Sequence, residues 1–130
     1  MSNTRRKFNS ETSYRKRVIM VESDPEVRKT LSRLLFTRLF VQVSLADSFG
    51  EALDIIMNTN DDISYVIFDE NAARALSERA LADYLQSHQE ITTKFILFAK
   101  QNCPQWPGKL VRTIDKAEIT TLLTTVAGDA

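Results

Sequence analysis

Apolar and polar positions alternate along the chain in blocks whose spacing changes from strand-like to helical. Val18–Val21 is a short, continuously apolar run with β-branched residues, which is typical of a strand buried on both faces. Asp24-Pro25 then favours a helix start, because Asp can cap free N–H groups and Pro suits the first helical position. From there apolar residues recur at helical spacing through Leu35.

The same alternation continues to the end of the chain. Further strands are predicted at 40–45, 63–68 and 95–98, with a short fifth strand at 110–111. Further helices are predicted after Asp47 or Ser48, as one long helix over about 72–88, and over 117–126. The segment QNCPQWPG at 101–108 contains Pro104 and Pro107 and therefore cannot form a regular helix.

Buried strands separated by helices predict an α/β fold with a parallel sheet covered on both faces. We expect a flavodoxin-like three-layer sandwich with a five-stranded parallel sheet in the order 2-1-3-4-5. Only about nine residues, 100–108, link the fourth and fifth strands, whereas a parallel crossover needs a dozen or more. The fourth helix is therefore expected to be missing or shortened.

Composition narrows the class of protein. The 130 residues suffice for one domain, and 43% hydrophobic with 26% charged residues indicates a soluble globular chain. No apolar run approaches the roughly 20 residues that span a bilayer. Cys103 is the only cysteine, which excludes an internal disulfide and favours a reducing compartment, with the cytoplasm as the expected location.

Net charge is zero, but residues 1–17 carry six cations against Glu11 alone. We interpret 1–16 as a basic flexible tail and 17–127 as the folded domain. Such a tail is either a solvated leader or a contact for an anionic surface. The domain itself shows no recognition helix or basic stripe, so nucleic-acid binding by it is not expected.

Acidic residues gather where the predicted strands end. Glu22, Ser23 and Asp24 follow the first strand, and Asp69 follows the third. Ligands of open α/β sheets bind at the carboxyl ends of strands, and the first and third strands are neighbours in the expected order. The acids are therefore expected to share one pocket, with Asp24 better placed as the cap of the following helix.

These segments resemble the receiver domain of bacterial two-component response regulators over about residues 17–127. The resemblance rests on IMVESDPEVRKTL, SLADSFGEAL and YVIFDEN, in that order and spacing. It implies that Asp69 stands at the phosphoacceptor position, and that Glu22 and Ser23 stand at the two acids that help to hold Mg²⁺. Serine is a poor replacement there, because a hard cation prefers charged oxygen.

The resemblance weakens at the positions that act after phosphorylation. Ala99 replaces the hydroxyl residue after the fourth strand, and Lys109 falls at the position of the switching aromatic. Arg112 takes the position of the lysine after the fifth strand, and the two side chains are not equivalent at a tight site. Arg112 could form an ion pair with Asp69 or Glu22, so that a protein cation replaces the metal.

The resemblance therefore implies a degenerate receiver, or pseudo-receiver, that signals through protein–protein interaction without conventional phosphorylation. No cofactor is expected, and a metal at Glu22 and Asp69 would be weakly held. The alternative is a phosphoacceptor response regulator in a phosphorelay, modified on Asp69 by a histidine kinase with Mg²⁺. A third reading is the N-terminal regulatory domain of a longer protein.

Enzyme activity on a substrate is not expected, since the sequence lacks a Gly-rich phosphate loop, a Ser–His–Asp pattern and HExxH. The expected partners are signalling proteins, with a histidine kinase and a homodimer both possible.

Overall fold

The computed structural model describes residues 16–100 and 110–128. The described chain forms a five-stranded parallel sheet in the order β2-β1-β3-β4-β5, which confirms the predicted topology. The strands are β1 (Arg17–Val21), β2 (Gln42–Leu45), β3 (Tyr65–Phe68), β4 (Lys94–Ala99) and β5 (Arg112–Asp115).

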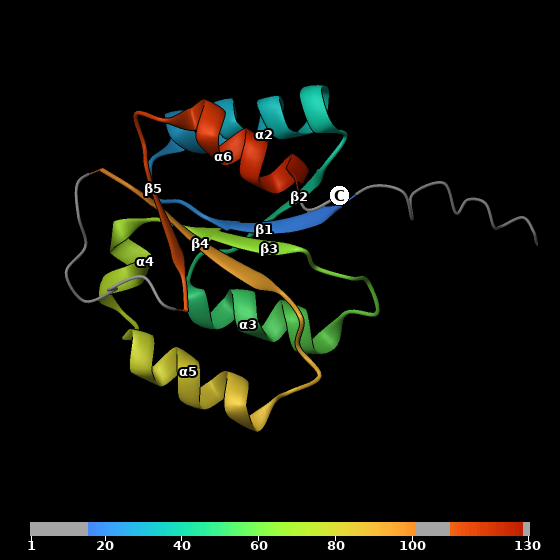
Figure 1. Cartoon of the computed structure of the whole chain (residues 1–130), viewed down its shortest axis with the longest axis vertical. Helices are drawn as coiled ribbons and strands as arrows, with labels where there is room; N and C mark the ends of the chain where they lie inside the picture. The colour runs from blue at the N-terminus through green and yellow to red at the C-terminus, as the bar shows by residue number, and fades with distance from the viewer. Residues whose placement is uncertain (1–15, 101–109, 129–130) are drawn as a thin grey trace, which may run out of the picture.

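Helices cover both faces of this sheet, so the fold is the expected three-layer sandwich (Figure 1). One face carries α2 (Pro25–Leu39) and α6 (Ile119–Gly128); the other carries α3 (Phe49–Asn58), α4 (Glu70–Arg74) and α5 (Glu78–Ser87). None of the helices in the described part of the chain is long and apolar enough to cross a membrane.

Two apolar cores lie between these layers. On one face the sheet packs against Leu31 and Leu35 of α2 and Leu122 and Val126 of α6. On the other face, Phe49 of α3 lies against the sheet with its ring edge-on to Phe68 and stacked on Phe95. Every residue of β3 is buried, as the continuous apolar run in the sequence predicted.

The prediction of one long helix over 72–88 is wrong, because the chain forms two helices there, α4 and α5. Asp69 caps α4, and Ser77 caps α5 by accepting a hydrogen bond from the N–H of Ala80. The apolar periodicity continues through both helices, whereas the second N-cap at Ser77 interrupts the backbone hydrogen bonding. A helix start is therefore a stronger boundary signal here than hydrophobic spacing.

The fifth strand also differs from the prediction. It runs from Arg112 to Asp115 and pairs with β4 from Ile96 to Ala99, whereas residues 110–111 precede it. Only Ile114 of this edge strand is buried. The residues proposed for the reduced fourth helix lie almost entirely at 101–109, outside the described residues. Lys100, Leu110 and Val111 are not helical.

Candidate functional site

The predicted acidic pocket lies at the carboxyl edge of β1 and β3. The two strands pair in register, Val21 with Phe68, so Glu22 and Asp69 are the next residues of adjacent strands. Both are buried, with 5% and 2% of their surface exposed. They line a cavity of about 220 Å³ together with Ser23 and other polar side chains. The structure thus brings together the acids that the sequence placed at one edge.

Both carboxylate oxygens of Asp69 already accept hydrogen bonds from the protein. Oδ1 accepts from the N–H of Ala72 at 2.9 Å, which makes Asp69 the N-cap of α4. Oδ2 accepts two bonds from Ser23, one from the backbone N–H at 2.9 Å and one from the hydroxyl at 2.8 Å. The carboxylate is therefore fixed by three neutral donors.

Ser23 is the centre of a short polar chain that leads from Asp69 to the surface. Its hydroxyl donates to Asp69 and accepts a bond from the Asn71 side-chain amide at 2.7 Å. The guanidinium of Arg74 in turn donates to the Asn71 carbonyl oxygen. Sequence reasoning missed Asn71 and Arg74, although their position in the first turns after Asp69 places them beside this edge.

Asp24 does not turn into the pocket. Its side chain is exposed and accepts a bond from the N–H of Glu26 at 2.9 Å, so it caps α2 as the Asp-Pro pair predicted. Its backbone N–H donates to Glu22 Oε2 at 3.1 Å. Asp24 therefore serves the site through its main chain, and its carboxylate is already used by the helix.

The cation of the site is Lys116, which the sequence analysis did not single out. It follows β5, and its ammonium lies 3.2 Å from Glu22 Oε2 and 3.1 Å from Glu70 Oε1. Its backbone N–H donates to the Ala99 carbonyl at 2.9 Å, which holds it next to the end of β4. Sequence reasoning missed Lys116 because the fifth strand was predicted to end at Val111, five residues earlier.

Placing Arg112 at the position after β5 is therefore wrong. Arg112 is the first residue of β5 and pairs with Ile96, three residues before the strand end. It is exposed, and no carboxylate among the described residues forms an ion pair with it. The proposed neutralisation of Asp69 or Glu22 by Arg112 has no support in this geometry.

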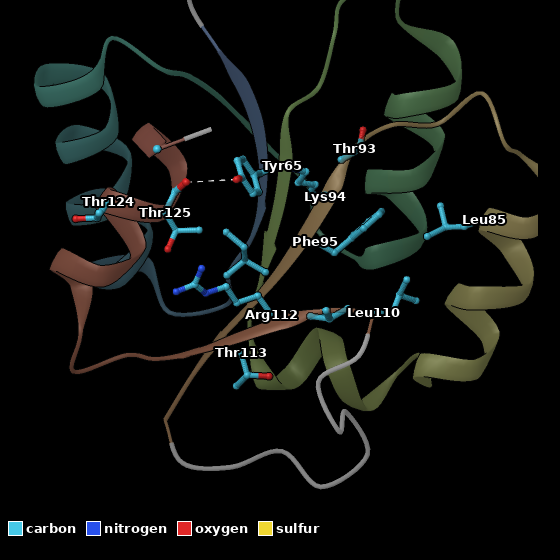
Figure 2. Close-up of a pocket in the computed structure, with 13 residues that line it drawn as sticks. Tyr65, Leu85, Thr93, Lys94, Phe95, Leu110, Arg112, Thr113, Thr124 and Thr125 are labelled. Carbon is cyan, nitrogen blue, oxygen red and sulfur yellow. Dashed lines mark hydrogen bonds between the residues drawn. The ribbon is translucent and has the colours of Figure 1, made fainter. Parts of the chain in front are cut away.

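Arg112 instead lines a different and larger cavity. This open groove, about 840 Å³, runs beside β5 between α5 and α6. Figure 2 shows the Arg112 side chain on the α6 side, near Thr125, whose carbonyl oxygen accepts a bond from the Tyr65 hydroxyl at 3.3 Å. None of the acids predicted for the site lines this groove.

Burial and pairing shift the pKa values of the three charged groups around Lys116. Burial raises the pKa of Glu22, and the charge of Asp69 adds to this, although the Asp24 N–H and Lys116 oppose it. Burial also disfavours the charge of Glu70, but hydrogen bonds from its own N–H, from Lys116 and from the Lys100 N–H outweigh it and lower its pKa. Burial would lower the pKa of Lys116, yet Glu70 and Glu22 together raise it.

The remaining predicted positions are partly accounted for. Ala99 ends β4, is 1% exposed, and brings no hydroxyl to this edge. Lys109, expected at the position of the switching aromatic, lies outside the described residues. Lys109 lies three residues before Arg112, the residue expected after β5. Because Lys116 is the residue that follows β5, the corresponding position of the aromatic is Thr113, which is exposed and not aromatic.

The oxygens that could hold a divalent metal ion at this edge already accept hydrogen bonds from the protein. Hard cations take six or more oxygen ligands, with carboxylates preferred. Here Glu22 Oε2 already accepts a bond from Lys116, Asp69 accepts three hydrogen bonds, and Ser23 donates its hydroxyl proton to Asp69. Within residues 16–100 and 110–128, no group of three or more His, Cys, Asp or Glu side chains is arranged to hold a metal.

The comparisons with known proteins bear on the fold. No protein-family model matches the sequence, and no curated protein matches it. Among solved structures, the chain is similar to a response regulator receiver domain protein from Bacillus halodurans C-125, with a TM-score of 0.59. The match covers 88% of this chain and 96% of that one, at 15% identity. At this identity the likeness shows that the chain has the receiver fold.

Proposed function

We propose that this protein is an atypical receiver-like signalling domain that acts through protein–protein interaction, without conventional switching by phosphorylation. Its setting is the cytoplasm and two-component signal transduction. The observation that carries the proposal is that both oxygens of Asp69 are engaged: together they accept three hydrogen bonds from the protein, and the residue is 2% exposed. A carboxylate that attacks phosphorus needs a free oxygen and a cation beside it.

The positions around Asp69 support the same proposal. Ser23 brings a neutral oxygen where a second acid would bind Mg²⁺, and its hydroxyl occupies Asp69. Ala99 offers no hydroxyl to a phosphoryl oxygen, and Thr113 offers no aromatic ring to move with it. Each half of the hydroxyl–aromatic switch is therefore replaced by a residue that cannot perform it.

Lys116 brings a positive charge to the acidic edge of the sheet. It lies between Glu22 and Glu70 and is held by both carboxylates. Because these bonds form without any phosphoryl group, they favour one conformation of the edge at all times. In this proposal the surface presented to a partner is fixed, and signalling depends on whether the partner is present.

A phosphoacceptor response regulator remains the second candidate. It is favoured by one observation: Glu22, Asp69 and Lys116 lie at the same edge, as in a working receiver pocket. In that case a histidine kinase would modify Asp69 with the help of Mg²⁺, after Ser23 had released the carboxylate.

Intact mass distinguishes the two candidates. The protein is incubated with Mg²⁺ and acetyl phosphate, and beryllofluoride is used in parallel to follow adduct formation by hydrogen exchange. We expect no phosphoryl adduct on the wild type and no protection of the residues around Asp69. A stable adduct that disappears in Asp69→Asn would establish the second candidate instead.

Ser23→Asp is the matched gain-of-function variant. It supplies the missing acid and removes the hydroxyl that occupies Asp69, so we expect Mg²⁺ binding, measured by calorimetry, to appear only in this variant. Comparable Mg²⁺ binding by the wild type would contradict the proposal.

A further inference from the structure

Helix α2 presents an exposed stripe in which two cations are followed by two aromatic rings. The stripe consists of Lys29, Arg33 and Phe36, whose spacing of four and three residues places them on one side of the helix, and of Phe40, the C-cap, which follows at the helix end. Phe36 is 50% and Phe40 60% exposed. Leu31 and Leu35, on the other side, are buried in the core, so the stripe lies opposite the face of α2 that packs on the sheet.

Phe40 adopts a backbone conformation that normally requires glycine. Its φ of 57° and ψ of 34° are left-handed, and it is the only non-glycine residue with positive φ among those described. Its N–H donates to the Phe36 carbonyl at 3.0 Å, and the next N–H, of Val41, donates to the Leu35 carbonyl at 3.1 Å, which ends the helix. A phenylalanine here is strained, and its ring remains in water.

The stripe is complementary to itself. The midpoint between positions 29 and 40 is also the midpoint between positions 33 and 36. A two-fold axis through this point, between Leu34 and Leu35, would set position 33 opposite position 36 of an antiparallel second helix, and position 29 opposite position 40 at the end of that helix. Lys29 would face Phe40 of the second copy, and Arg33 would face Phe36 of the second copy.

We propose that a second copy of this chain docks antiparallel along the stripe, forming a weak homodimer held by cation–π contacts. Cations over aromatic faces attract, whereas a parallel arrangement would bring like charges together. Neither Lys29 nor Arg33 forms an ion pair with a carboxylate of the described residues, so both are available. One pair of helices makes a small interface, and the dimer is accordingly transient. This inference does not depend on the phosphorylation state of Asp69.

A swap of residues across the two-fold axis tests the pairing. Sedimentation of the full chain over a concentration series should show a monomer–dimer equilibrium. Phe36→Arg sets Arg against Arg and should weaken dimerisation by about tenfold or more. The double variant Arg33→Phe/Phe36→Arg exchanges the two partners and should restore it. Arg38→Ala, which changes an exposed cation outside the stripe, should leave the dissociation constant unchanged.

Phe40→Gly provides a readout that a purely structural role would not give. Glycine relieves the left-handed strain, so the thermal midpoint should rise, while the loss of the ring weakens the dimer. The inference is overturned by a chain that stays monomeric at millimolar concentration, or by a dimer that Phe36→Arg does not weaken. It is also overturned if the swapped variant fails to recover, or if the monomer binds phosphatidylserine vesicles through this stripe.

Discussion

Two buried carboxylates lie side by side in this pocket and are stabilised in opposite ways. Asp69 is surrounded by neutral donors, namely the N–H and hydroxyl of Ser23 and the N–H of Ala72. Glu22 instead lies against the ammonium of Lys116, which it shares with Glu70. Among the described residues, the only cation that forms an ion pair with either carboxylate is Lys116, and it pairs with Glu22, whereas Asp69 is held by neutral donors.

This difference separates two properties that a working phosphoacceptor must combine. Both oxygens of Asp69 accept hydrogen bonds from the protein, and Lys116, the cation paired at this edge, is already bound to Glu22 and Glu70. Removing a partner should therefore have a different cost on each side of the pocket. A lost cation leaves a buried charge, whereas a lost hydroxyl leaves one unmade hydrogen bond.

The largest effect is expected from Lys116→Met. It leaves Glu22, whose side chain is 3% exposed, without its cation, and should lower the free energy of unfolding by about 3 kcal/mol. Urea unfolding measures this. Adding Glu22→Gln to the same chain removes the orphaned charge and should recover much of the loss. An equal loss in both variants would show that Lys116 acts through packing and not through charge.

Asp69→Ala should come next, with a loss of about 2 kcal/mol, because it removes an N-cap and leaves the donors of Ser23 unsatisfied. Asp69→Asn keeps an oxygen that can cap α4 and should lose less. The difference between the thermal midpoints of the two variants measures the contribution of the cap of α4, separately from that of the bonds to Ser23. Identical midpoints would mean that the cap contributes nothing.

Ser23→Ala sharpens the comparison further, since it removes one donor to Asp69 and keeps the backbone N–H. A loss of about 1 kcal/mol is expected, the usual value for one hydrogen bond. The variant should also free one lone pair of Asp69 without adding a charge. A loss as large as that of Asp69→Ala would mean that the hydroxyl alone fixes the carboxylate.

The smallest effect is the pH dependence of stability. Lys116 has a raised pKa, so its contribution is present below its ordinary value of 10.5 and is lost as the pH rises through the folded-state value. Tyr84, whose pKa is raised by burial and by Asp54 and Glu90, loses stability in the same alkaline range. Because Tyr84 is common to both proteins, Lys116→Met should show a shallower alkaline decline than the wild type in thermal midpoints.

On the acid side the two glutamates oppose each other. Glu70 has a lowered pKa, and its contribution is lost as the pH falls below 4.5 through the folded-state value. Glu22 has a raised pKa in the folded protein, so its ionisation destabilises the folded state as the pH rises through that value. Acidification removes this destabilisation. Glu70→Gln should therefore make mild acid stabilising relative to the wild type. A steeper acid loss in this variant would contradict the sign assigned to Glu22.

The buried part of the fold could be predicted from the sequence because burial on both faces leaves continuous apolar runs. Val18–Val21 and the run ending at Phe68 each became a central strand, and their order placed Glu22 beside Asp69. The cap at Asp24 was equally readable, since Asp-Pro has a local mechanism that needs no tertiary information.

The edge of the sheet could not be predicted in this way. In β5 only Ile114 faces the core, so the apolar pair Leu110–Val111 gave a stronger but misleading signal. Val111 is indeed buried, at 1% exposure, yet it lies before the strand. This shift of a few residues moved the expected cation from Lys116 to Arg112, and one misplaced edge strand thus removed the central ion pair from the predicted site.

The contacts of Lys116 also have a kinetic consequence. Glu22 follows β1, Glu70 comes two residues after β3, and Lys116 follows β5, so a single ammonium ties β5 to β1 and β3, from which β4 separates it. Its bond to Glu22 spans 94 residues of sequence, and it can close only after the last strand has docked. Contacts that form this late are absent from most folding transition states. Lys116 should therefore slow unfolding while leaving the folding rate nearly unchanged, and it contributes to the lifetime of the native state.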